Sequence, residues 1–332
     1  MVAGIENIAG TQGSFVSARE SAWHMLGTVL PGEFSAEEGM RIAHLAGWDV
    51  RKLASFAEET VITETGVETF RIAGKDRYFT VRTNPVTGER EFLGDVGSRY
   101  TVIQNEDHAE FLNTLTDMSG AHFETMGSLF GGTRVFMSMK LPAHITVGGD
   151  VTDMYLIALN SHDGSSEFKI CVSTIRPVCH NTVTAAFAGA KTEVSMRHTR
   201  NATGRVQDAR EALGMGFAYQ ERFQKEAEAL LAQSFTDAQF DAFLASLFEV
   251  KDVEDTSTRK KNIMQDVRNL WTGSTTLEIA KNTRYGAYQA FTEYTTHFAG
   301  AHGKGQEQAI NRAQRDVLDN KIRTRAFQLL SA

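Results

Sequence analysis

The strongest constraint on the fold is a hairpin pattern in the middle of the chain. Residues 122–130 and 133–141 flank the pair Gly131-Gly132, a frequent sequence for a tight turn between antiparallel strands. From Val135 to Leu141, apolar residues recur at every second position, which is the period of a strand. The pattern predicts two antiparallel strands joined by a short turn.

A second hairpin pattern follows. Residues 151–160 and 166–174 flank the sequence His162-Asp163-Gly164, and Asp-Gly is another frequent turn dipeptide. The run from Tyr155 to Leu159 is apolar on both faces, which is typical of a central strand that is covered on both sides. The two hairpins together predict an antiparallel sheet in this part of the chain.

The remaining segments divide into a mixed half and a helical half. Ser35 and Glu38 have the spacing of a helix capping box, and Asn105 is expected to cap a helix over 106–118. The other predicted strands are 49–56, 67–73, 77–83, 98–103 and 192–198. After Gly204 the apolar pattern is helical, and we expect helices over 205–232, 236–249, 258–271, 283–298 and 306–330.

These elements predict an α+β fold. A mainly antiparallel sheet with hairpins forms the N-terminal body, and a helical C-terminal region follows it. We expect an irregular N-terminal segment at 1–34, an α+β core domain at 35–202 and the helical region at 203–332. The composition, 42% hydrophobic and 23% charged, is that of a folded globular protein.

Charge is distributed unevenly along the chain. The net charge is −7, but residues 251–332 hold 13 Lys and Arg against 9 Asp and Glu, which makes this part +4 and the first 250 residues −11. A basic part on an acidic body suits either a phosphate-binding face or a contact between copies of the chain. An ordinary solvated helical surface is the alternative.

The sequence also bears on membrane association and redox environment. No apolar run approaches the roughly 18–20 residues that span a bilayer, so we expect no membrane partner. The first residues lack the basic and apolar pattern of a secretion signal. Two cysteines suit a reducing cytoplasm better than a disulfide framework.

The segment from Arg176 to Thr182, Arg-Pro-Val-Cys-His-Asn-Thr, is a candidate anion site. A helix that Asn181 caps, ending near Gly189, would expose unpaired backbone N–H groups and the positive end of its dipole. The alternative is that Asn181 only caps the helix and Arg176 pairs with a surface carboxylate. The predicted anion-binding or nucleic-acid-binding residues are Arg176, Asn181, Thr182, Arg197, His198, Arg200 and Arg205.

A second set of residues has catalytic side chains. His162, Asp163, Cys179 and His198 are candidates for a hydrolytic or nucleotide-modifying site, and all four are acceptable zinc-ligand types. Their spacing does not match a zinc motif, so no metal or cofactor is predicted. His180 follows Cys179 directly, and adjacent side chains point apart. A buried, unreactive cysteine and a plain Asp-Gly turn are the alternatives.

Two aromatic features have structural and functional interpretations. Trp23 lies in a short apolar stretch, where it and Leu26 are expected to fill a hydrophobic groove, although stacking on a nucleobase is the alternative. Tyr285, Tyr288, Phe291 and Tyr294 recur at three-residue steps and predict a packing face on a helix.

Several motifs together resemble a known family. They are Trp23-His24 with Leu26-Gly27-Thr28, Tyr100 to Asn105, Asn160 to Ser165, Arg176 to Thr182, Arg197 to Thr199 and Asn282 to Tyr294. This ordered set resembles the phage- and plasmid-like proteins of the DUF932 family over nearly the whole chain. His180 departs from the glutamine that is expected there. The resemblance implies no established activity, only a gene of phages or plasmids that acts in the cytoplasm of a bacterial host.

From these observations we expect a nucleic-acid-binding protein. Binding or annealing of single-stranded DNA through phosphate contacts, by a homo-oligomer, is the leading interpretation. The sequence lacks a phosphate loop, a Gly-x-Ser-x-Gly elbow and a dinucleotide fingerprint, which argues against familiar enzyme classes without deciding the matter. The alternatives are a hydrolase or nucleotide-modifying enzyme that uses the His, Asp and Cys residues, and a structural or interaction protein without a catalytic site.

Overall fold

The chain folds into two compact units. The computed structural model describes residues 4–8, 13–116, 120–190, 193–198, 206–250, 256–298 and 320–332. The first unit comprises Met1–Ala143 with Asp153–Gly216, and the second comprises His144–Thr152 with Phe217–Ala332. The units therefore divide within a helix after Gly216, whereas the sequence places the division at 202/203.

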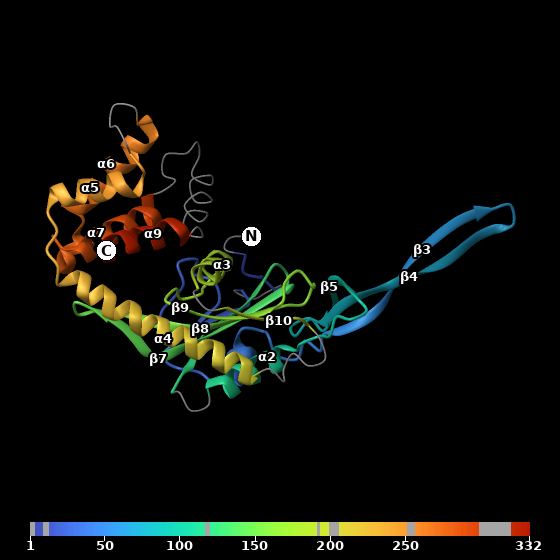
Figure 1. Ribbon diagram of the computed structural model, residues 1–332. Helices are drawn as coiled ribbons and strands as arrows, with labels where there is room; N and C mark the ends of the chain where they lie inside the picture. The colour runs from blue at the N-terminus through green and yellow to red at the C-terminus, as the bar shows by residue number, and fades with distance from the viewer. Residues whose placement is uncertain are drawn as a thin grey trace. The chain divides into compact units, whose positions relative to one another are not determined.

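The first unit is built on a seven-stranded sheet (Figure 1), in the order β10-β9-β8-β7-β6-β1-β2. β1 and β2 pair in parallel, and the pairs β1–β6, β6–β7, β8–β9 and β9–β10 are antiparallel. The predicted α+β fold with a mainly antiparallel sheet is confirmed. The strands are β1 (Phe15–Ala18), β2 (Thr28–Leu30), β6 (His122–Leu129), β7 (Arg134–Val147), β8 (Asp150–Ser161), β9 (Phe168–Ser173) and β10 (Glu193–Met196).

A second sheet in this unit has three antiparallel strands. They are β3 (Arg51–Thr63), β4 (Gly66–Thr83) and β5 (Arg90–Gly97). The strand predicted at 98–103 is wrong, and β5 takes its place. Residues 98–103 are rich in strand-forming side chains, but their hydrogen bonds go elsewhere: Tyr100 donates to the carbonyl of Ser161 and the Thr101 amide to the carbonyl of His198.

Three helices in the first unit follow the predicted capping signals in part. They are α1 (Ala36–Ile42), α2 (Asn105–Thr116) and α3 (His180–Gly189). The Ser35 hydroxyl accepts from the Glu38 amide at 3.1 Å, so Ser35 caps α1 as predicted. The segment 1–34 was expected to be irregular, yet it contains β1 and β2, which are too short to show a strand pattern.

The C-terminal part is helical, as predicted. Its helices are α4 (Val206–Leu231), α5 (Asp237–Leu247), α6 (Thr258–Gly273), η2 (Thr275–Ala280), α7 (Arg284–Glu293), η3 (Tyr294–Phe298) and α9 (Asn320–Ser331). Phe240 of α5 stacks on Trp271 of α6 with ring centroids 4.6 Å apart. Tyr285, Phe291 and Tyr294 are buried, so the aromatic stripe is a packing face. Of the helix predicted at 306–330, residues 306–319 lie outside the described residues.

A buried ion cluster connects the two sheets of the first unit. Arg82 of β4 donates through Nη1 to Glu6 Oε2 at 3.0 Å and through Nε to Glu91 Oε2 at 2.8 Å. Its guanidinium also lies over the Trp48 ring, 4.2 Å from the centroid. Glu6 accepts a further hydrogen bond of 2.5 Å from Ser128 of β6. A buried cation and its partners thus tie the N-terminal segment, β4, β5 and β6 together.

We predict that Arg82→Met lowers the free energy of unfolding by about 3–5 kcal/mol, because the substitution leaves Glu6 charged and buried without its partner. The measurement is urea unfolding of the full chain, followed by circular dichroism. Arg77→Met is the matched control, since Arg77 forms an exposed pair with Asp95 and its loss should change stability little. Equal effects of the two substitutions would contradict the prediction.

Candidate functional site

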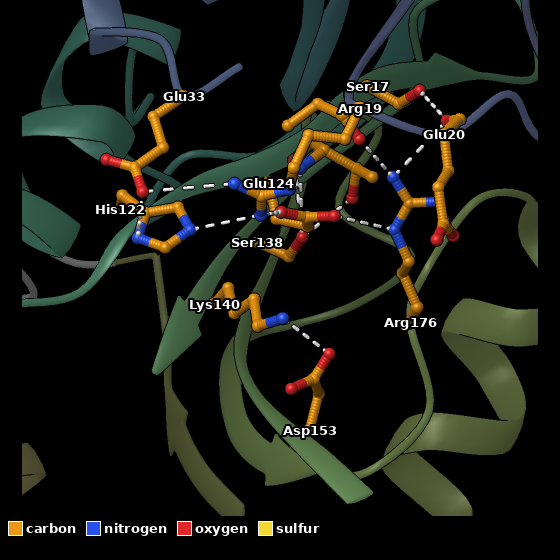
Figure 2. Close-up of polar contacts among 12 residues, drawn as sticks. Ser17, Arg19, Glu20, Glu33, His122, Glu124, Ser138, Lys140, Asp153 and Arg176 are labelled. Atoms are coloured by element: carbon orange, nitrogen blue, oxygen red, sulfur yellow. Dashed lines mark hydrogen bonds and ion pairs between the residues drawn. The ribbon is translucent and has the colours of Figure 1, made fainter. Parts of the chain in front are cut away.

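Arg176, a predicted phosphate ligand, is bound by its own fold. Its Nε donates to Glu124 Oε1 at 2.8 Å, and its Nη2 donates to the carbonyl of Ala18 at 2.8 Å. Glu124 lies on β6 with a buried side chain, and it also accepts from Arg19 at 2.6 Å (Figure 2). Two guanidinium groups therefore share one buried carboxylate, and Arg176 holds the segment after β9 against β6 and β1.

The start of α3 differs from the predicted one. The helix begins at His180, so its N-cap is Cys179 and the prediction that Asn181 caps it is wrong. The Thr182 hydroxyl accepts from the amides of Val178 and Cys179 at 2.8 and 2.9 Å. Because the Thr182 side-chain oxygen accepts from these amides, the backbone N–H groups before α3 have hydrogen-bond partners without a cap from Asn181.

Arg197 is the exposed member of the predicted anion-binding set. Its side chain is 85% exposed and pairs with Glu167 at 3.2 Å. Arg197 follows β10 and lies near the start of β9, because Met196 pairs with Phe168, whereas Arg176 follows the end of β9. The two arginines therefore lie at opposite ends of β9 and do not meet. Arg200 and Arg205 lie outside the described residues.

His162 and His198 of the predicted catalytic set lie close together, and a third histidine joins them. His162 directly follows β8 and begins the turn, and its Nε2 lies 3.0 Å from Asn105 Oδ1. The His198 ring stacks on Tyr100 with centroids 4.8 Å apart. His108, on α2, was not predicted, although it follows Asn105 on the side of α2 that carries Phe111 and Leu112.

The three histidines are neutral and enclosed. Burial lowers the pKa of His108 and of His162 to about 3, and that of His198 to about 4. Among the described residues, both ring nitrogens of His108 and of His198 and Nδ1 of His162 lack a hydrogen-bond partner. The rings of His108 and His162 are fully buried, so a substrate has no access to them.

The other two catalytic candidates have structural surroundings. Cys179 is buried in an apolar cluster with Phe15, Leu129 and Val183, apart from the histidines. Partial burial raises the pKa of Asp163, but hydrogen bonds from Ser161 and Ser165 outweigh this effect and hold the pKa below its ordinary value. These bonds close the turn after β8. In the described ranges, no three His, Cys, Asp or Glu side chains converge as metal ligands.

A cavity of about 300 Å³ lies between α3 and the sheet. Arg134 of β7, Lys169 of β9 and His180 of α3 bring polar groups to it, and Glu193 of β10 pairs with Lys169 at 2.8 Å. The cavity combines an apolar wall with two cations from different strands, Arg134 and Lys169, and with the imidazole of His180. Its lining residues are Leu129, Arg134, Leu159, Ser166, Lys169, His180, Val183, Thr184, Phe187 and Glu193.

Sequence reasoning pointed to α3 but missed most of this cavity. His180 belongs to the predicted motif, whereas Arg134 and Lys169 were not singled out. Lys169 lies within the predicted strand 166–174, and Arg134 lies just after the Gly131-Gly132 turn. The order of strands in the sheet brings β7, β9 and β10 to one face of α3. The spacing of these residues along the chain does not reveal that order.

A family model described as a domain of unknown function (DUF932) matches residues 92–317 of the chain. No curated protein and no solved structure matches it. Within the part of the chain that the structure describes, no helix is long and apolar enough to pass through a bilayer.

We predict that the free energy of unfolding falls as the pH drops below the ordinary histidine pKa of 6.5. At that pH the histidines of the unfolded chain become protonated, whereas the buried rings of the folded chain stay neutral down to about pH 3–4. Each buried histidine contributes at most about 1.4 kcal/mol per pH unit to this loss. Urea unfolding at about pH 7 and about pH 5.5 measures it. His108→Phe should reduce the slope by about one proton, since the ring at this position already packs against Phe168, which in turn contacts Phe111. An unchanged slope in this variant would refute the assignment.

Proposed function

Because the chain belongs to the DUF932 family, whose description names no activity, we propose from the geometry of the α3 cavity that it binds single-stranded nucleic acid. The observation that carries the proposal is the combination, in one cavity, of an apolar wall with Arg134, Lys169 and His180. A nucleotide has the matching combination of a flat apolar base and an anionic phosphate.

The apolar wall suits a nucleobase. Leu129, Leu159 and Val183 line the cavity, and Phe187 of α3 is a partly buried aromatic ring beside them. A volume of about 300 Å³ lies at the lower end of the range for ligand pockets, so the cavity suits one nucleotide rather than a larger ligand. Stacking of a base on an aromatic side chain is worth about 1–3 kcal/mol and does not depend on sequence.

The cations around the cavity suit phosphates. Lys169 and Glu193 form a surface pair whose side chains are each about a third exposed, and surface pairs of this kind contribute about 1 kcal/mol or less. A phosphate therefore competes readily for Lys169. Arg134 donates to the neutral Ser165 hydroxyl at 3.2–3.3 Å, and Arg197 is exposed beside Glu167, which follows the lining residue Ser166.

His180 suits recognition of a base edge. Burial, together with the positive charge of Arg134, lowers its pKa, so the ring is neutral near pH 7. A neutral imidazole presents one donor and one acceptor nitrogen. We assign His180 a hydrogen-bonding role toward the base and leave the charge contacts to Arg134 and Lys169.

Trp23 supplies a second aromatic surface near the start of α3. The prediction that it fills a groove is wrong, because its side chain is 62% exposed while Leu26 packs against the apolar cluster. The loop is fixed by His24, whose Nε2 lies 2.7 Å from the carbonyl of Val178. The ring next to His24 is therefore held close to the residues that begin α3, where a neighbouring base could stack on it.

The wider setting of this function is also a proposal. A reducing cytoplasm agrees with two buried free cysteines, whereas the phage or plasmid origin rests on the resemblance of the sequence motifs alone. The alternative of a hydrolase that uses His162, Asp163, Cys179 and His198 has less support. A reacting group must be accessible, and the rings and thiol of this set are enclosed.

We predict that the full chain binds labelled single-stranded DNA in a fluorescence anisotropy titration and that added salt weakens binding. Lys169→Gln should weaken it roughly three- to ten-fold and lower the salt slope by about one, since one phosphate contact is lost. Glu193→Gln should strengthen binding, because it removes a competing carboxylate from Lys169.

Lys140→Gln is the matched control. Lys140 forms a similar surface pair with Asp153 and does not line the cavity, so the affinity should not change. Opposite effects at Lys169 and Glu193 are not expected from damage to the fold, which would weaken binding in both variants. If the unchanged chain shows no salt-sensitive binding at micromolar concentration, or if Lys140→Gln weakens binding as much as Lys169→Gln, the proposal fails.

We further predict that single-stranded DNA quenches the tryptophan fluorescence of the chain and that Trp23→Phe abolishes the quenching. Trp48 and Trp271, the remaining two of the three tryptophans, are buried, so the exposed Trp23 is the ring that a base can reach. Phenylalanine preserves stacking, so the affinity should change little. Quenching that persists in Trp23→Phe would exclude Trp23 from the interface.

A further inference from the structure

The hairpin of β3 and β4 extends beyond the rest of its sheet as a two-stranded arm (Figure 1). β5 covers β4 only from Arg77 to Thr83, whereas β3 and β4 stay paired from Phe56 and Ala73 out to the turn. We call residues 56–73 the arm. An isolated two-stranded hairpin is marginally stable in water, so the arm is expected to have a binding partner.

The arm exposes apolar side chains near its tip. Ile62 and Val67 face each other across the two strands and are 85% and 68% exposed. Contiguous exposed apolar surface on a folded protein usually marks an interaction site. The exposed large apolar residues of the arm are Phe56, Val61, Ile62, Val67, Phe70 and Ile72.

The charge of the arm restricts the choice of partner. Four glutamates stand against the single Arg71, so the arm has a net charge of −3. Such a surface repels a nucleic acid strand and also repels a second arm. The partner should instead combine an apolar floor with positive charge. The four are Glu58, Glu59, Glu64 and Glu68.

The second unit carries a surface with these properties. A cavity of about 340 Å³ between α5 and α6 is lined by Leu244, Val250 and Met264, with Lys261 and the Arg268–Asp241 ion pair among its polar residues. Helix α6 has four basic residues against one acidic residue, Asp266, and so a net charge of +3. We call this cavity the α5–α6 groove. Its full lining is Asp241, Leu244, Val250, Thr256, Lys261, Met264, Gln265 and Arg268.

The basic residues of α6 are placed against the helix dipole. Arg259, Lys260 and Lys261 occupy its first turns, where acidic side chains stabilise a helix and basic ones destabilise it. An acidic partner that approaches the start of α6 removes this unfavourable interaction. The carboxylates near the arm tip, Glu64 and Glu68, have the required charge.

We propose that the arm of one copy of this chain binds in the α5–α6 groove of a second copy. Ile62 and Val67 pack against the partly exposed Val250 and Met264, and the arm carboxylates face the basic start of α6. Each copy has both an arm and a groove, so two copies can exchange arms reciprocally in a closed dimer, and a head-to-tail contact produces rings or chains of copies. The assembly does not depend on nucleic acid binding.

Sedimentation velocity without nucleic acid, over a wide range of protein concentration, tests the proposal. The unchanged chain should form species larger than one copy, and Ile62→Glu in the arm or Lys261→Glu in the groove should each yield single copies. An equal mixture of these two variants should form a species of two copies and no larger one. In that pair, the intact arm of the groove variant binds the intact groove of the arm variant.

Val86→Glu is the control, because Val86 is also an exposed apolar residue of the first unit but lies in the turn between β4 and β5. It should assemble like the unchanged chain. Circular dichroism establishes that each variant is folded. The proposal is overturned if the unchanged chain stays a single copy at every concentration. It is also overturned if Lys261→Glu assembles normally while Ile62→Glu does not, which would indicate contact between arms.

Discussion

The first unit depends on one buried cation. Arg82 leaves the three-stranded sheet and meets Glu6, which in turn accepts from Ser128 of the seven-stranded sheet. A buried charge is tolerated only where its partners are fixed, so the two sheets cannot slide past each other without exposing it. Gly132 shows how tight this fit is, since a Cβ atom there would lie 2.4 Å from Arg82 Nη1. The turn that precedes Arg134, and so one edge of the α3 cavity, is thereby held in place.

The same pairing of arginine or lysine with a carboxylate has different consequences at different depths. Glu124 is buried, so its charge needs both Arg176 and Arg19 as partners, and the Arg176–Glu124 pair serves the fold. Lys169 and Glu193 are partly solvated, so water screens their attraction and a phosphate can replace the carboxylate. Burial, rather than residue type, therefore separates the structural cations from those available to a ligand. Burial thus makes Arg176 a structural cation, and its place at the other end of β9 keeps it from forming one site with the exposed Arg197.

Local signals in the sequence were sufficient for most of the fold. The Gly131-Gly132 and Asp163-Gly164 turns, the Ser35 cap and the helices after Gly204 follow from backbone preferences and short-range periodicity. The site required information of longer range. Residues 98–103 have strand-forming side chains, yet Tyr100 bonds to Ser161 and becomes part of the histidine cluster instead. His108 joins that cluster only because α2 packs near the end of β8, and Lys169 meets His180 only through the order of the strands. No spacing along the chain encodes such pairings.

The distribution of charge ties the two proposals together. A chain with a net charge of −7 binds a polyanion only where cations are concentrated and acidic surface is kept away. Binding of the acidic arm in the α5–α6 groove neutralises the basic start of α6, so this helix contributes little to phosphate binding in the assembly. Under the proposed function, Arg134, Lys169 and Arg197 supply the positive charge for the strand, next to the apolar wall proposed for a base. Assembly in this arrangement repeats one cavity per copy, and a strand that contacts several copies gains affinity from their linkage without any new contact within a single copy.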